Sequence, residues 1–132
     1  MSAMATVRHH VIVGVPADDA WRLLGDPSRV SEWFPGITSC VVEGATRTVT
    51  LATGLSFPEE LVTVDGLQRR FQYAVRMPIV RSHLSTLDVL ELGARQCCCA
   101  YAADADPAVM ALVIGGAAAL GLERAKSLLE GN

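Results

Sequence analysis

One run of residues near the end of the chain constrains the fold most, because it predicts a single long helix. Pro107 is tolerated in the first turn of a helix, and Asp106 before it is a candidate cap for the free amides. No other proline interrupts residues 107–130, and Gly131 follows as a helix end. Apolar residues at three- and four-residue steps predict one buried stripe, made of Val109, Leu112, Val113, Gly116, Leu120 and Ala125.

Length and composition predict one domain with a sizeable core. The chain has 132 residues, of which 51% are hydrophobic and 19% are charged. Eleven Lys and Arg against fourteen Asp and Glu give a net charge of -3 without a basic cluster, so we expect no nucleic-acid partner. The apolar stretch 107–122 is shorter than the ~20 residues that span a bilayer, so we expect a buried helix and no stable membrane insertion.

The cysteines and the N-terminal residues bear on the compartment. Cys97, Cys98 and Cys99 are consecutive, so on a strand they would point to alternating faces and could not converge on one metal ion. Together with Cys40 they are interpreted as small apolar side chains in a reducing compartment. No basic segment followed by an apolar block opens the sequence, so we expect no signal peptide and a cytoplasmic protein.

Upstream of the long helix the sequence predicts seven strands and two short helices. The strands are expected at residues 7–15, 37–43, 46–53, 57–65, 70–77, 82–92 and 96–103. The short helices are expected at residues 17–24 and 28–34, between the first and second strands. Because the later connections are short enough for hairpins, we expect the last six strands to form an antiparallel meander.

Several local strings occur in an order that is found in a known superfamily. They are residues 15–21, 26–27, 33–37 and 47–51, then Gly54, Glu59, Leu61, Asp65 and Tyr73, and finally residues 106–107 before the helix. This order resembles the START-like or helix-grip superfamily (SRPBCC), and within it the polyketide cyclase/dehydrase and lipid-transport family. The resemblance spans nearly the whole chain. It implies that residues 1–132 form one α+β ligand-binding domain, with a seven-stranded antiparallel curved sheet wrapped around the long C-terminal helix.

Two positions depart from the usual pattern of that family. Members tend to carry an aromatic residue early in the sixth strand, where this chain has His83, and a tryptophan in the last strand, where it has Tyr101. Aromatic residues make up only 5% of the chain. We therefore expect a cavity lined more by aliphatic and small side chains than is common in the family.

The resemblance implies a cavity between sheet and helix for a small hydrophobic ligand. The expected lining residues are Trp33, Phe57, Phe71, Tyr73, Val75, Met77, His83, Ser85, Leu87, Cys99, Tyr101, Val113, Gly116 and Ala117. Gly115 and Gly116 thin the middle of the helix, although each glycine costs about 1 kcal/mol relative to alanine. Two explanations for these glycines are considered: they leave room for a ligand, or they let the helix backbone approach the sheet or a second subunit closely.

His83 is the candidate acid or base if the protein is an enzyme, because the unperturbed pKa of histidine lies near physiological pH. With Glu59 and Tyr73 beside an apolar pocket, it would suffice for an aldol-type cyclisation or a dehydration. Alternatively, His83 is a strand histidine that hydrogen-bonds a neighbour or reaches solvent. The alternative for Glu59 is a rim carboxylate paired with an arginine such as Arg47 or Arg76.

Three functions are open at this stage. The first is a carrier or sensor of a small hydrophobic molecule, and the second is a cyclase- or dehydratase-like enzyme acting on a carbonyl-rich substrate. The third is an interaction module that dimerises through the apolar first half of the helix, residues 109–114, so that the protein is a monomer or a homodimer. No phosphate-binding loop, nucleophile elbow, His-Glu-x-x-His or Cys-x-x-Cys motif occurs, so we expect no nucleotide, flavin or metal cofactor.

Overall fold

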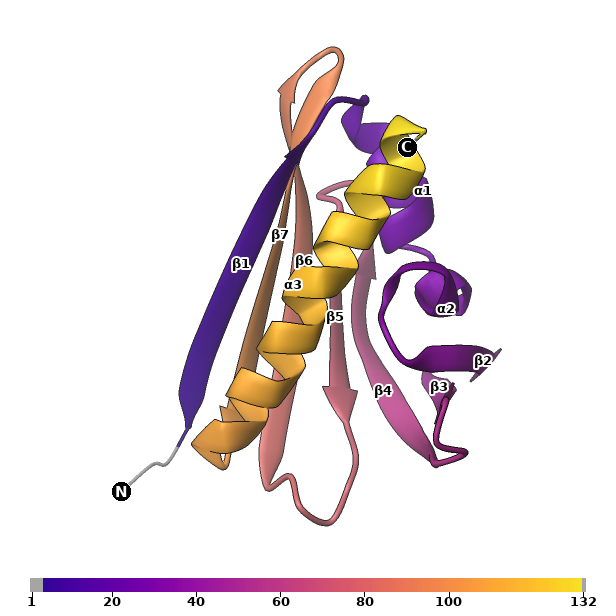
Figure 1. The fold of residues 1–132 in the computed structure, drawn as a ribbon, viewed down its shortest axis with the longest axis vertical. Helices are drawn as coiled ribbons and strands as arrows, with labels where there is room; N and C mark the ends of the chain where they lie inside the picture. Colours follow the sequence, from indigo (N-terminus) through magenta and orange to yellow (C-terminus); the bar gives the residue numbers. More distant parts are fainter. Residues whose placement is uncertain (1–3, 132) are drawn as a thin grey trace.

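The computed structural model describes residues 4–131 as a curved antiparallel sheet with helices on one face (Figure 1). The strands are β1 (Ala5–Val13), β2 (Ile37–Glu43), β3 (Thr46–Leu51), β4 (Ser56–Asp65), β5 (Arg70–Val75), β6 (Ser82–Gly93) and β7 (Gln96–Asp106). The helices are α1 (Ala17–Leu24), the 3-10 helix η1 (Pro27–Arg29), α2 (Val30–Trp33) and α3 (Ala108–Glu130).

The strand order in the sheet is β1-β7-β6-β5-β4-β3-β2. Strands β2 to β7 are therefore neighbours in chain order, and β1 pairs antiparallel with β7 at the other edge. This topology confirms the predicted seven-stranded helix-grip fold with its meander and its two short helical segments after the first strand.

The ends of several elements differ from the sequence prediction: β1 spans Ala5–Val13 rather than residues 7–15, and β5 ends at Val75 rather than at residue 77. Strand β7 continues to Asp106, and the second short helix is divided into η1 and α2. Strand β3 ends at Leu51, because Gly54 at φ +92° turns the chain back into β4. The predicted cap of α3 is wrong: the side chain of Asp106 accepts a hydrogen bond from Arg81 Nη2 at 2.8 Å, and the N-cap residue is Pro107 without a side-chain bond.

The predicted apolar stripe of α3 is also wrong, except at Ala125. The residues that α3 buries are Ala111, Gly115, Ala118, Gly121, Leu122 and Ala125. Val109, Leu112, Val113 and Leu120 are instead 57%, 64%, 58% and 66% exposed. Alanine and glycine bring the helix close to β1 and β7, so the side chosen for packing is the side with the smallest residues rather than the most apolar ones.

Gly115 and Gly116 differ sharply in their surroundings. A Cβ atom on Gly115 would lie 2.5 Å from Cγ1 of Val7 in β1, whereas a Cβ on Gly116 would meet nothing within 4 Å. Close approach of the helix backbone to the sheet is therefore the reason for Gly115. Gly116 lies on the exposed side of α3.

The exposed side of α3 carries large apolar residues. Among the described residues, α3 is the one helix whose length and composition would allow it to cross a membrane, and here its small side packs against the sheet. The predicted dimer would use this exposed side, at Val109, Leu112 and Val113. That dimer stays a prediction.

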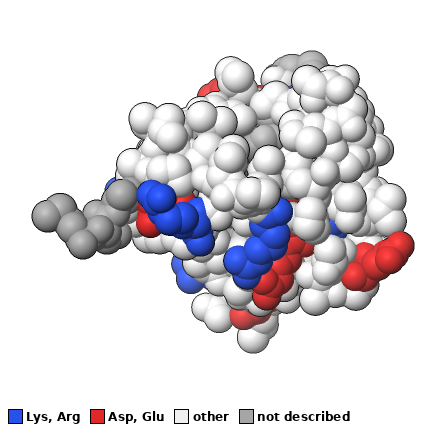
Figure 2. All heavy atoms as spheres, turned by 90° about the horizontal axis from the view of Figure 1, so that it is seen from below, with Lys and Arg blue, Asp and Glu red and all other residues white. Residues whose placement is uncertain are grey.

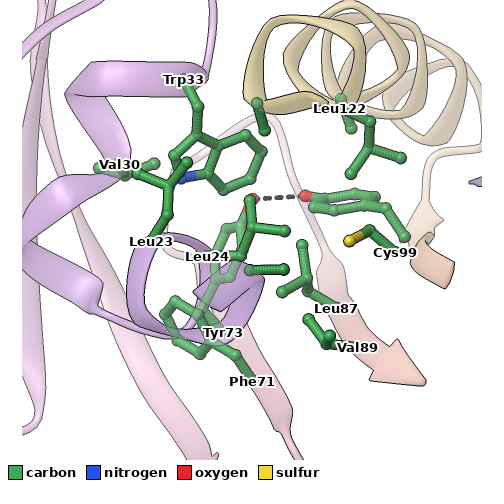
Figure 3. Close-up of a cluster of buried hydrophobic side chains, with 14 of the residues drawn as sticks. Leu23, Leu24, Val30, Trp33, Phe71, Tyr73, Leu87, Val89, Cys99 and Leu122 are labelled. Atoms are coloured by element: carbon green, nitrogen blue, oxygen red, sulfur yellow. Dashed lines mark hydrogen bonds between the residues drawn. The ribbon is translucent and has the colours of Figure 1, made fainter. Parts of the chain in front are cut away.

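The main core lies between the sheet and the helices (Figure 3). Its larger side chains come from α1, α2, three central strands and the second half of α3, and include Leu23, Leu24, Val30, Trp33, Phe71, Tyr73, Leu87, Val89, Tyr101 and Leu122. The predicted alternation of the cysteines is confirmed, since Cys97 and Cys99 are fully buried and Cys98 is only half-buried.

We expect Gly115→Ala to be less stable than Gly116→Ala by about 1–3 kcal/mol, the usual cost of overpacking. Both changes gain the same intrinsic helix propensity, so the difference isolates the contact with Val7. The free energies of unfolding in urea measure it. Equal stabilities of the two variants would contradict the close packing of α3 on β1.

Candidate functional site

A cavity of about 390 Å³ lies between α3 and the sheet. Its lining comes from the connection between α2 and β2, the β3–β4 turn, strands β4 and β5, and the first half of α3. Small-molecule sites typically have volumes of ~300–1,000 Å³ and mostly apolar linings. The cavity meets both conditions, since Thr53, Glu59 and Tyr73 are its polar side chains among the residues described.

About half of the residues predicted from the sequence line this cavity. They are Phe57, Glu59, Tyr73, Val75, Met77, Val113 and Ala117. The others lie outside it: buried in the protein interior are Trp33, Phe71, His83, Ser85, Leu87, Cys99 and Tyr101. Gly116 faces away on the exposed side of α3, although its neighbour Ala117 lines the cavity.

Several residues that line the cavity were not predicted from the sequence. Leu51 and Leu55 flank the β3–β4 turn, and Phe34 lies just before β2. Met110 and Ile114 line the cavity with Val113 and Ala117, at the three- and four-residue spacing of one helix side. That spacing was a usable signal, because it marks a second apolar side beside the alanine and glycine side.

The cavity reaches the surface where Leu55 and Val113 lie, which are 50% and 58% exposed. Figure 2 looks at the end of the molecule that lies at the bottom of Figure 1, and shows a broad uncharged area beside a band of charged side chains. In the connection between β5 and β6, Arg76 is paired with Glu60 and Arg81 with Asp106. An uncharged molecule could therefore enter beside Leu55 and Val113 without displacing a charged side chain.

The sheet side of the cavity, where Glu59, Tyr73 and Val75 lie, is called its floor here. Arg47 on β3 stands directly opposite Glu59 on β4, and both side chains are buried. Arg47 donates from Nε and Nη2 to Oε1 of Glu59, at 2.8 Å and 2.5 Å. This confirms the predicted pairing of Glu59 with Arg47, but the pair is buried and does not lie on the rim.

The third nitrogen of Arg47 is also occupied. Its Nη1 donates to the backbone carbonyl of Pro27 at 3.1 Å, and the guanidinium lies over the rings of Phe71 and Tyr73, 5.2 Å and 4.7 Å from their centroids. Burial raises the pKa of Glu59, and the Arg47 charge and hydrogen bonds oppose that shift. The buried guanidinium keeps its proton and donates two hydrogen bonds to Oε1 of Glu59, so an ionised Glu59 is the partner that balances its charge. In that state the floor carries no net charge.

Behind the floor, four side chains form a continuous hydrogen-bonded chain. The hydroxyl of Tyr73 bonds to that of Tyr101, as the dashed line in Figure 3 shows, and Tyr101 donates to Oγ of Ser85 at 2.6 Å. Nε2 of His83 lies 2.7 Å from the same Oγ. The backbone N–H of Val75 donates to Nδ1 of His83 at 2.8 Å. The chain thus runs from the cavity floor to a buried imidazole.

Burial controls the titration of this chain. Desolvation raises the pKa of Tyr73 to about 12, with the Glu59 charge adding to the shift, and it raises the pKa of Tyr101 as well. Desolvation also lowers the pKa of His83 to about 4. All three groups are therefore neutral at physiological pH. No group of three or more possible metal ligands occurs within residues 4–131.

Comparison with known proteins decides the family. A family profile described as polyketide cyclase / dehydrase and lipid transport matches residues 4–130. The chain belongs to this family. The predicted START-like superfamily is therefore confirmed, as is the polyketide cyclase/dehydrase group within it. A search of curated proteins found no match.

Solved structures with the same fold include several members of this superfamily. The protein XoxI from Bacillus cereus is 19% identical, with a TM-score of 0.88 over 96% of each chain. Norcoclaurine synthase from Thalictrum flavum, solved with a transition-state analogue, is 18% identical with a TM-score of 0.78 over 97% of this chain and 95% of that one. The Zhui aromatase/cyclase from Streptomyces sp. R1128 is 19% identical, with a TM-score of 0.77 over 96% and 94%. Because these sequence identities are below 25%, the similarity to the three solved structures shows only that the fold is shared.

The low pKa of His83 makes folding stability depend on pH. Its folded pKa of about 4 lies below the ordinary 6.5, so between these values the unfolded chain binds more protons and stability rises with pH. Over the window from pH 4 to 6.5, we expect wild type to gain up to about 3 kcal/mol more than His83→Gln. Urea unfolding across this range measures the difference. Parallel pH profiles for the two proteins would contradict a buried neutral imidazole.

Proposed function

We propose that the protein binds a small, largely apolar molecule in the cavity between α3 and strands β3 to β5, as a carrier or sensor. The observation that carries the proposal is the cavity itself: about 390 Å³, apolar on nearly all sides and open between Leu55 and Val113. The family to which the chain belongs is described by lipid transport as well as by cyclisation, which agrees with a binding role.

The titratable groups of the cavity favour binding over catalysis. Glu59 is held by Arg47, and Tyr73 has a pKa of about 12, so neither is suited to exchange protons near neutral pH. His83 does not line the cavity, and its Nδ1 is occupied by the Val75 amide. The residues that line the cavity include neither cysteine nor serine that could act as a nucleophile. The cytoplasmic location stays a prediction.

Filling the cavity should abolish binding. We expect Ala117→Leu to weaken binding of the uncharged fluorescent probe N-phenyl-1-naphthylamine at least about tenfold, because the added side chain occupies ligand volume. Gly116→Leu is the matched control, since its side chain would point into open space. Fluorescence titration measures both affinities. Equal affinities for the two variants, or no saturable binding by wild type, would refute the proposal.

An enzyme of the cyclase or dehydratase type is the second candidate. The observation that favours it is the hydrogen-bonded chain that links Tyr73 in the cavity, through Tyr101 and Ser85, to His83. Once its hydroxyl protons have reoriented, such a chain would let a proton pass between the ligand and the imidazole during enolisation of a carbonyl substrate.

The two candidates differ in proton exchange. For a carrier, we expect no acceleration of deuterium incorporation next to the carbonyl of 2-acetylnaphthalene in D₂O, measured by NMR. For an enzyme, exchange would be faster than in buffer and would fall in both Tyr73→Phe and His83→Gln. Accelerated exchange that both variants lose would therefore replace the carrier proposal by the enzyme.

A further inference from the structure

The two polar side chains of the cavity floor both have unused hydrogen-bond accepting capacity. Both hydrogen bonds from Arg47 reach Oε1 of Glu59, and none of the described residues donates to Oε2. An ionised carboxylate can only accept hydrogen bonds. Glu59 therefore offers the cavity an acceptor oxygen, and its partner Arg47, which does not line the cavity, has each of its three nitrogens engaged.

The direction of the buried chain makes Tyr73 an acceptor as well. Because Nδ1 of His83 accepts from the Val75 amide, the imidazole proton sits on Nε2 and is donated to Ser85. Tyr101 donates its single proton to the same Ser85 oxygen, so it must accept from Tyr73. The proton of Tyr73 is thereby used within the protein, and its oxygen retains a lone pair for a ligand.

We infer that the ligand carries a neutral hydroxyl group, as an alcohol or a phenol, whose single proton is shared between Glu59 and Tyr73 at the floor in a bifurcated hydrogen bond. This inference rests on the proposed binding function and specifies its ligand. A hydroxyl supplies the proton that both acceptors lack, while the apolar remainder lies against Phe57, Met77 and Val113. The sequence alone suggested a carbonyl-rich substrate only for the enzyme alternative.

Other polar groups fit the floor less well. An ether or ketone oxygen would face two acceptors and leave itself and them without partners, which is unfavourable in a buried site. A carboxylate would be repelled by Glu59. An ammonium group would add an uncompensated positive charge beside the Arg47–Glu59 pair, whose charges already balance.

Three probes with one ring system test the inference: 4-phenylphenol, 4-methoxybiphenyl and biphenyl-4-carboxylate. We expect calorimetry with wild type at pH 7 to give the phenol the highest affinity. Its advantage over the ether should be about two- to tenfold, the net effect of one hydrogen bond. An ether that binds as tightly as the phenol or more tightly would overturn the inference while leaving the cavity a binding site. Failure of all three to bind would overturn the proposed function and the inference with it.

The variant Tyr73→Phe assigns the preference to the floor. It removes one acceptor and nothing else from the cavity lining, so the phenol should lose about two- to tenfold in affinity while the ether is unchanged. The ratio of the two affinities is the readout, because a general loss of folding or of cavity shape would weaken both probes alike. An unchanged ratio would remove Tyr73 from ligand recognition and contradict its role as an acceptor.

Discussion

The close packing of α3 on β1 and β7 is the constraint on which the rest of the molecule depends. Ala111, Gly115 and Ala118 bring the helix backbone against one edge region of the sheet, and Gly115 leaves no space for a side chain next to Val7. The larger residues of the same helix, among them Met110 and Ile114, are then directed over β4 and β5. Because the sheet curves, that side of the helix faces the cavity.

The charges and hydrogen bonds of the cavity floor determine which polar group a ligand can place there. The Arg47–Glu59 pair lies in the row that continues to Val75, whose amide fixes the tautomer of His83. A buried ion pair gives little net stability, but the loss of one partner costs about 3–5 kcal/mol, so the pair holds both side chains in place. The neutral floor and the fixed direction of the Tyr73–Tyr101–Ser85 chain leave oxygens that can only accept. Apolar walls set the ligand's bulk, and these oxygens set its polar end.

The sequence predicted the topology well. Successive strands joined by short turns form hairpins, and this leaves few possible arrangements of the sheet. The sequence named Arg47 and Arg76 as possible partners of Glu59, but it did not predict that the pair with Arg47 would be buried. The side of α3 that packs on the sheet was not predictable from hydrophobicity, since apart from Leu122 the buried residues are alanine and glycine. The separation of His83 from the cavity was equally hidden: it shares the inward side of β6 with Ser85 and Leu87, but the cavity extends over β4 and β5 instead.

A crystal structure of the protein purified from its own source tests the central claim most directly, because it shows whether the space beside α3 holds a molecule. We expect continuous density between Val113 and the floor, with one polar atom of the bound molecule within hydrogen-bond distance of Glu59 Oε2 and Tyr73 Oη. A cavity closed by inward rotation of Met77 and Met110, with no space left for a ligand, would contradict the claim that this protein binds a small apolar molecule.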